Sequence, residues 1–357
     1  MATTVPPGAP LLSRLFPKIS QSRDVRLAGP IAGELLGADQ LAERARKLAR
    51  SQRLRTKKGR GKTPLLARLN ETRAILDAAN TRLAKAADAD VDVGPAGEWL
   101  LDNYHVVEEH IREVHESLPR GYYRELPELA TGTLAGYPRV YEIAITLIAH
   151  TEGRIDLDNV HLFVGAFQEV ATLSVGELWS IPAMLRLGLI ESVRRMSLRT
   201  VIRLDEVEEA DRWAARMIAA NAQGHAALGI VLNQFVAMTP RLTATFVSRF
   251  LHQLRLSQDT FAPLIWMEQW IAEEGLSAEE AVARSTERLA LTQVMTANSI
   301  TSLRAIARFD WRTFVERQSV MEQVLRDDPH GYYSRMTFAT RDHYRHVVER
   351  IAKRTKT

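Results

Sequence analysis

The chain has 357 residues, of which 46% are hydrophobic and 25% charged. This is an ordinary globular composition, and it excludes disordered, collagen-like and coiled-coil sequences. The length allows two domains, or one large domain with an arm. The sequence has no cysteine, which excludes disulfide bonds, thiolate metal sites and a cysteine nucleophile.

Residues 1–30 begin MATTVPPGAPLLSRLF, with early prolines and without the charged-then-apolar order of a secretory signal. We expect this segment to be cytoplasmic and disordered.

A basic tract lies between residues 44 and 62. The chain carries a net charge of +4 and this tract +10, so the remainder carries −6. Such a tract suggests an anionic partner, either nucleic acid or the cytoplasmic face of a membrane, although a solvated helix end that runs into a basic loop has the same pattern. Its candidate binding residues are Arg44, Arg46, Lys47, Arg50, Arg53, Arg55, Lys57, Lys58, Arg60 and Lys62.

We predict a basic helical arm over residues 31–94, which ends in the segment ADADVDVGPAG. A helical body over 95–357 follows, because apolar residues recur there at helical spacing. One predicted helix runs from Trp99 to Leu118 and stops at Pro119. Alternating strand patterns are absent, so the sequence predicts an all-α fold, a multi-helix bundle-like body with the basic arm in front.

Capping boxes mark two helix starts, Ser174 with Glu177 and Ser277 with Glu280, the second before a helix that reaches about residue 309. Pro182 predicts that the helix after Ser174 breaks into two pieces. Residues 217–240 lack charged side chains and are long enough to span a membrane, but their polar residues favour a buried core helix.

Some chemical motifs fail on spacing. The segment around Lys62 lacks the first glycine of a phosphate-binding loop. His105 and His110 are five residues apart, off the spacing at which two imidazoles on a helix share a metal ion, so we predict no metal site. Asp156 is typical of a helix N-cap.

A polar and aromatic belt contains the candidate sugar-binding or interdomain residues. Aromatic faces beside Arg and Asp can hold a sugar, and they can equally join helices within a core. These candidates are Trp99, Asp102, His105, Arg120, Tyr122, Tyr123, Arg124, Arg139, Tyr141, Glu177 and Trp179. Spacing assigns none of them a catalytic role.

The belt also carries a family resemblance. The quoted segments, in chain order, are EWLLDNYHVVEE from Glu98, LPRGYYRELP from Leu118, GYPRVY from Gly136, AHT from Ala149, GELW from Gly176, NSITSLR from Asn298 and FATRDHYR from Phe338. Together they resemble the N-terminal region of the cyclic β-1,2-glucan synthases, large bacterial inner-membrane enzymes that make cyclic glucan from UDP-glucose.

The resemblance implies a cytoplasmic N-terminal helical module, or a truncated product, of such a synthase. It would scaffold or regulate the enzyme, because the chain lacks recognisable transferase motifs, and whether it is an enzyme by itself stays open. The alternative is a stand-alone binding module for an anionic membrane surface, nucleic acid or glucan.

The implied partners are the transferase and membrane portion of the same synthase, with inner-membrane anionic lipid as a further candidate and nucleic acid disfavoured. The implied location is the cytoplasmic face of the bacterial inner membrane. We expect no cofactor in this chain, whereas the full enzyme would use UDP-glucose and a divalent metal.

Overall fold

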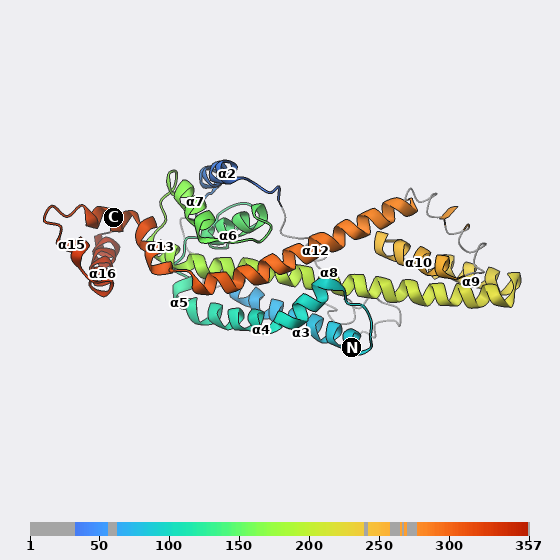
Figure 1. The fold of residues 1–357 in the computed structure, drawn as a ribbon. Coiled ribbons are helices and arrows are strands. Elements are labelled where there is room, and N and C mark those ends of the chain that lie inside the picture. The colour runs from blue at the N-terminus through green and yellow to red at the C-terminus, as the bar shows by residue number, and fades with distance from the viewer. Residues whose placement is uncertain are drawn as a thin grey trace. The chain divides into compact units, whose positions relative to one another are not determined.

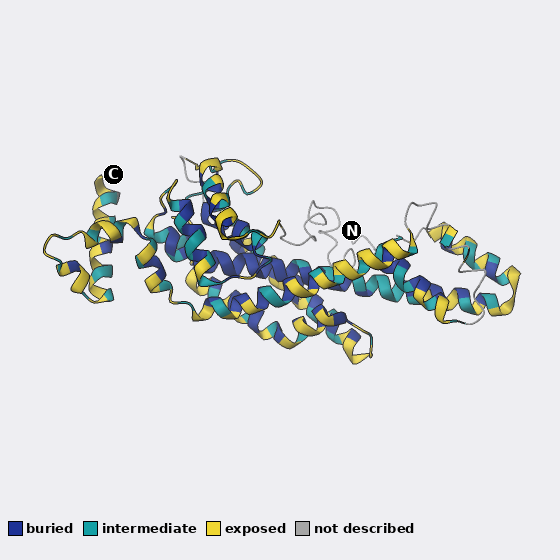
Figure 2. Cartoon of the chain, turned by 45° about the horizontal axis from the view of Figure 1, so that its top comes forward, coloured by how far each residue is buried: buried dark blue, intermediate teal, exposed yellow. Residues whose placement is uncertain are grey.

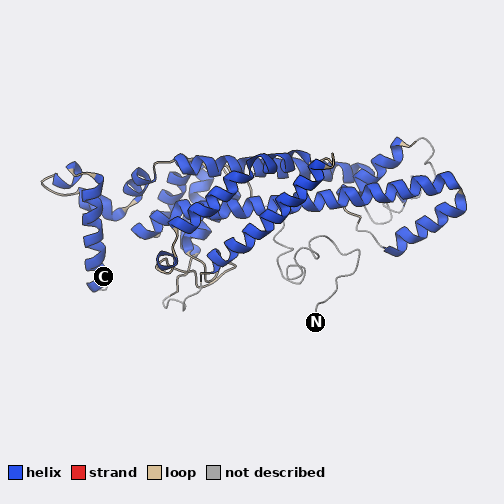
Figure 3. Cartoon of the chain, turned by 90° about the horizontal axis from the view of Figure 1, so that it is seen from below, coloured by secondary structure: helices blue, strands red, loops and turns tan. Residues whose placement is uncertain are grey.

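The computed structural model describes residues 33–55, 63–238, 242–257, 265, 268–269 and 277–355, except the side chain of Lys353. Within these residues it has fourteen helices, no strand and two isolated β-bridges (Figure 3). The prediction of an all-α fold is confirmed. The predicted disordered segment, residues 1–30, lies outside the described residues.

The helices follow one another in the order shown in Figure 1. Their bounds are α2 (Ala38–Ser51), α3 (Pro64–Asp88), α4 (Gly94–Ser117), α5 (Arg120–Tyr123), α6 (Arg139–His150), α7 (Leu157–Gln168), α8 (Val175–Gln223), α9 (His225–Met238), α10 (Ala244–Leu256), α12 (Ala278–Arg308), α13 (Trp311–Gln318), α14 (Val320–Arg326), α15 (Tyr332–Arg335) and α16 (Phe338–Thr355).

The described residues fall into two compact units, each built from separate stretches of chain. Unit 1 contains Ala74–Tyr104 and Ser192–Ala297, and unit 2 contains Ile31–Arg73, His105–Glu191 and Asn298–Thr357. The division into a basic arm up to residue 94 and a body after it stays a prediction.

Unit 1 has an aromatic core between α8, α9 and α10. The Trp213 and Phe235 rings meet edge to face with centroids 4.9 Å apart, and Phe250 stacks on Phe235 at 5.7 Å. All three side chains are buried. Such ring pairs add to the free energy gained from burying apolar area, so they hold α9 and α10 on α8.

Unit 2 has a core in which α2, α6 and α7 pack together (Figure 1). Leu48 of α2, Leu147 of α6 and Phe163 of α7 are buried there. Helix α13 packs on α7, where the rings of His161 and Phe314 lie 4.9 Å apart. Burial of one stripe per helix is the pattern expected from their amphipathic sequences.

The predicted helix caps are present. The Glu280 amide donates to the Ser277 hydroxyl at the start of α12, and the Asp156 carboxylate accepts from the Asn159 amide at the start of α7. Ser174 and Glu177 form the other predicted capping box, at the start of α8. These short-range pairs explain why the sequence located the helix starts well.

The predicted break at Pro182 is wrong. Helix α8 runs from Val175 to Gln223 as one helix with this proline inside it. Every residue from 180 to 191 is buried, so the packing of this segment within unit 2 outweighs the cost of about 3 kcal/mol that a proline imposes on a helix interior.

The predicted buried helix over 217–240 differs from the structure in the part described. Gly224, with a φ of +108°, separates α8 from α9, and glycine adopts this conformation without the steric cost of a side chain. Only Leu228 and Phe235 of α9 are buried, and Ile230 and Met238 are exposed.

None of the described helices combines the length and the apolar character needed to cross a membrane.

Candidate functional site

The centre of the predicted belt is a buried ion pair in unit 2. Arg139, at the start of α6, donates from Nε and Nη2 to the two carboxylate oxygens of Glu177, at 2.5 and 2.9 Å. Nη2 also donates to the Thr172 carbonyl at 2.7 Å. Glu177 is 1% exposed and Arg139 is buried. This is the paired geometry in which a guanidinium and a carboxylate bind each other most strongly.

Glu177 also caps α8. Its carboxylate accepts from the amide and the hydroxyl of Ser174 at 2.9 and 3.0 Å, and its own amide donates to the Ser174 hydroxyl. Both carboxylate oxygens are therefore occupied by protein donors, which suits a structural group better than an acid or base that must exchange a proton with a substrate.

The belt's tyrosines also make internal contacts. The Tyr122 hydroxyl donates to the Gly176 carbonyl, next to Glu177. Burial raises the pKa of the Tyr122 and Tyr123 phenols, so both stay neutral over the physiological range. Tyr123 and Tyr141 are buried, and the ring of Tyr141 lies 5.8 Å from that of Tyr137. Buried rings offer no face to a sugar from solvent.

The remaining belt candidates are divided between the two units. Trp99 and Asp102 belong to unit 1, whereas the other candidates belong to unit 2. Trp99, Asp102, His105, Arg120 and Arg124 are exposed, and Trp179 is half-buried.

Another segment of the resemblance, NSITSLR, binds a loop within unit 2. The Ser302 hydroxyl of α12 donates to the Gly153 carbonyl, and it accepts from the Ile155 amide, both at 2.8 Å. The Asn298 amide group donates to the Glu152 carbonyl at 3.1 Å. The NSITSLR segment therefore holds the loop that follows the AHT segment.

Of the two histidines that the sequence analysis weighed as metal ligands, His105 is exposed and His110 contacts an arginine. His110 is buried beside Arg186, whose Nε lies 3.2 Å from His110 Nδ1, and Arg186 Nη2 pairs with Glu113 at 2.7 Å. In the part of the chain that the structure describes, no three His, Asp or Glu side chains come together in a way that could hold a metal ion.

His110 predicts a pH dependence of stability. Burial lowers its pKa below the ordinary 6.5, although the nearby Glu113 opposes this shift. Near pH 6.5 His110 becomes protonated in the unfolded chain but stays neutral in the folded chain. The free energy of unfolding therefore falls as the pH drops below 6.5.

The variant His110→Asn keeps an acceptor near Nδ1 but cannot titrate, so its stability should fall less between pH 7.5 and 5.5. Urea denaturation of both proteins at the two pH values tests this. Burial also lowers the pKa of His161, which is present in both proteins, so the difference between them isolates His110. Identical losses of stability would contradict the assignment.

Acidic residues of unit 2, one of them on α2 itself, form ion pairs with part of the basic tract. Arg46 donates to Glu169 at 2.7 Å, and Arg46 and Arg50 both bind Glu43 at 3.3 Å. Arg55 binds Glu128 at 3.3 Å. The hydrogen bond to Glu169 raises the pKa of the Arg46 guanidinium. Lys57, Lys58, Arg60 and Lys62 lie outside the described residues.

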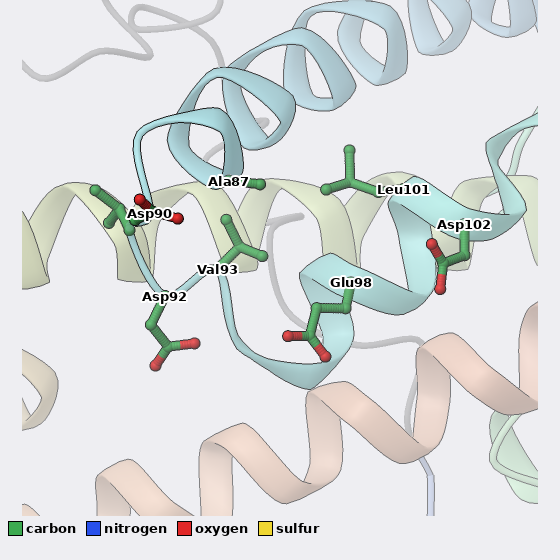
Figure 4. A pocket seen from close by; sticks show the side chains of 8 residues that line it. Ala87, Asp90, Asp92, Val93, Glu98, Leu101 and Asp102 are labelled. Atoms are coloured by element: carbon green, nitrogen blue, oxygen red, sulfur yellow. The ribbon is translucent and has the colours of Figure 1, made fainter.

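Sequence reasoning did not identify a carboxylate-lined hollow of about 580 Å³ in unit 1, although Asp102 was among its candidates (Figure 4). Asp90, Asp92, Glu98 and Asp102 surround the apolar side chains of its lining. Asp92 accepts from the Gly94 amide at 2.7 Å and lies 3.6 Å from Arg203. The hollow can accept hydrogen bonds from hydroxyl or amino groups of a small molecule.

Sequence reasoning also missed a buried charge network at the C-terminal end of unit 2. Glu322 of α14 accepts from Arg345 Nη1 and from the Tyr333 hydroxyl, both at 2.7 Å. Glu316 of α13 accepts from Arg341 at 2.8 Å and from Arg345 at 3.1 Å. The network fixes α15 and α16 on α13 and α14. The i, i+4 spacing of Glu322 and Arg326, which bind at 2.9 Å, is the signal that could have revealed it.

No protein-family model matches the chain. The curated cyclic beta-(1,2)-glucan synthase NdvB of Rhizobium meliloti (strain 1021) is 35% identical to it over 280 residues, which cover 77% of the chain and 10% of that protein. The chain therefore spans about a tenth of the length of this relative. The resemblance found in the motifs is confirmed: the chain is similar, over most of its own length, to part of a cyclic β-1,2-glucan synthase.

Proposed function

We propose that this chain is the N-terminal helical module of a cyclic β-1,2-glucan synthase, lies at the cytoplasmic face of the inner membrane, and scaffolds the transferase and membrane portion of that enzyme. The synthesis of glucan from UDP-glucose belongs, in this proposal, to the other portion. The similarity to the Rhizobium meliloti synthase over 280 residues supports the assignment to this kind of enzyme.

One structural observation supports the scaffolding role: residues of the resemblance segments are engaged in contacts within the protein. Arg139 of the GYPRVY segment pairs with Glu177 of the GELW segment. Ser302 of the NSITSLR segment binds the loop after the AHT segment, and Arg345 of the FATRDHYR segment anchors α16. Residues that are occupied with each other maintain the shape of a surface for a partner, whereas catalytic groups must be free to contact a substrate.

The described residues offer no donor set for the divalent metal that a nucleotide-sugar transferase would use. In the described residues no carboxylate or histidine cluster could hold a metal ion. In this proposal the transferase portion binds the metal and UDP-glucose.

The test combines the purified full chain with membranes that contain a synthase lacking the matching region. We expect the chain to bind these membranes and to raise the incorporation of radiolabelled UDP-glucose into glucan, and we expect no incorporation by the chain alone. Neither binding nor an effect on incorporation would overturn the scaffolding role, and incorporation by the chain alone would place a catalytic site within it.

The variant Glu177→Gln, introduced into the same assay, separates the shape of the module from its mere presence. If the ion pair maintains the binding surface, this variant should stimulate incorporation less than the unchanged chain at equal concentration. The control Glu43→Gln removes an exposed carboxylate that also binds arginine and should leave the stimulation unchanged.

A further inference from the structure

Helix α16 carries an exposed apolar stripe. Tyr344, Val348 and Ile351 are 47%, 36% and 56% exposed, and their spacing of four and three residues places them on one side of the helix. Most of α16 is exposed or half-buried (Figure 2). The rings of Tyr344 and Tyr333 lie with their centroids 6.3 Å apart, so the N-terminal end of the stripe packs against α15.

The charge network determines which side of α16 faces α13 and α14. Arg341 and Arg345 bind Glu316 and Glu322, and Arg345 is only 2% exposed. At 3.6 residues per turn, these two arginines lie on one flank of the stripe. The anchored flank faces α13 and α14, and the stripe is left outside the contact.

The other flank of the stripe is basic and exposed. Arg350 and Arg354 are both exposed, and helical spacing places them on the side of the stripe away from the anchored arginines. The carboxylate of Asp342, on the same helix, is already paired with Arg345 at 3.1 Å. An apolar stripe bordered by cations is the pattern of a helix that lies in the interface of an anionic membrane.

We propose that this face of α16 rests on an anionic lipid surface, with Tyr344, Val348 and Ile351 entering the headgroup boundary and Arg350 and Arg354 pairing with lipid phosphates. The size of the stripe favours lipid over a protein partner. A specific protein interface buries about 800 Å² on each side, which three side chains do not supply, whereas an interfacial helix needs only apolar insertion and charge attraction. The proposal holds whether or not the chain scaffolds a transferase.

The test measures partition of the full chain into phosphatidylcholine vesicles with and without phosphatidylglycerol. We expect binding only to the anionic vesicles, and the double variant Val348→Asp/Ile351→Asp should weaken it by about tenfold or more. The double variant Arg350→Gln/Arg354→Gln should weaken binding and reduce its dependence on salt.

A matched control makes the same chemical change on another helix. Val282 and Val294 of α12 are 45% and 44% exposed, so Val282→Asp/Val294→Asp adds the same charge to similarly exposed valines and should leave partition unchanged. Partition that is equal in the α16 and α12 variants would overturn the proposal. Loss of binding only after the residues from Arg44 to Lys62 are neutralised would overturn it too.

A second measurement does not depend on the folding of the aspartate variants. The sequence has no cysteine, so a polarity-sensitive fluorophore can be attached at a single Ile351→Cys or Val294→Cys site. The dye at position 351 should shift to shorter wavelength with anionic vesicles, and the dye at 294 should not. If the dye at position 351 shifts when an acidic protein is added but does not shift with anionic vesicles, this face of α16 binds a protein and the lipid proposal is rejected.

Discussion

The variant Glu322→Gln should destabilise the packing of α13, α14, α15 and α16 by about 3–5 kcal/mol, the usual effect of removing one partner from a buried ion pair. Glu322 has no exposed surface and accepts hydrogen bonds from Arg345, Arg326 and Tyr333. An amide group in its place replaces the only fully buried carboxylate partner of Arg345 by a weaker, neutral acceptor, while Glu316 and Asp342 remain as partners that are more exposed. Urea denaturation and the rate of tryptic cleavage in α16 measure the loss.

The matched control is Glu43→Gln. Glu43 also binds two arginines, Arg46 and Arg50, but its side chain is 59% exposed. Exposed ion pairs contribute about 0–1 kcal/mol, so this variant should unfold nearly like the unchanged protein. Equal losses in the two variants would show that burial is not the source of the effect.

The pH dependence of stability provides a second check on the role of Glu322. Burial opposes the charge of Glu322, but the hydrogen bonds from Tyr333, Arg345 and Arg326 outweigh it and hold the pKa of this carboxyl below its ordinary 4.5. A carboxylate with a lowered folded-state pKa stabilises the protein above 4.5 and loses that contribution as the pH falls through the folded-state value. The stability difference between Glu322→Gln and the unchanged chain should therefore shrink on acidification.

The sequence predicted those parts of the fold that short-range chemistry decides. The all-α class follows from apolar periodicity, and the helix starts at Ser174 and Ser277 follow from pairs three residues apart. The break at Pro182 failed because the local cost of proline was outweighed by burial of the whole segment around it. The exposure of most of α9 was missed because a lack of charge does not say what packs against a helix.

The candidate site residues could be listed from the sequence, but the contacts between them could not be predicted, because the partners lie far apart in the chain. Arg139 and Glu177 were both candidates, but their contact joins α6 to α8 across 38 residues, and no local pattern pairs them. The charge of the basic tract could be counted, but its partners Glu128 and Glu169 lie far along the chain. The carboxylates that line the hollow come from two elements, Asp90 and Asp92 from the loop between α3 and α4 and Glu98 and Asp102 from α4.

The variant Glu177→Gln should lower the free energy of unfolding by about 3–5 kcal/mol, because it leaves Arg139 buried beside a neutral amide and weakens the cap of α8. Its two contributions can be separated. Ser174→Ala removes the cap hydroxyl and keeps the ion pair, so it should cost about 1 kcal/mol. Thermal or urea denaturation of both variants measures the difference.

The double variant Arg139→Met/Glu177→Met tests whether the ion pair itself stabilises the fold or only becomes costly when broken. Apolar side chains of similar volume often replace a buried ion pair without loss, because neither charge is then left without a partner. We expect the double variant to be more stable than Glu177→Gln. Together with the single variants Arg139→Met and Glu177→Met, it should give a coupling free energy well above the error of about 0.5 kcal/mol for independent sites. If the effects of the two substitutions simply add, Arg139 and Glu177 do not act as a pair, and the contact between the GYPRVY and GELW segments would lose its role in maintaining the module.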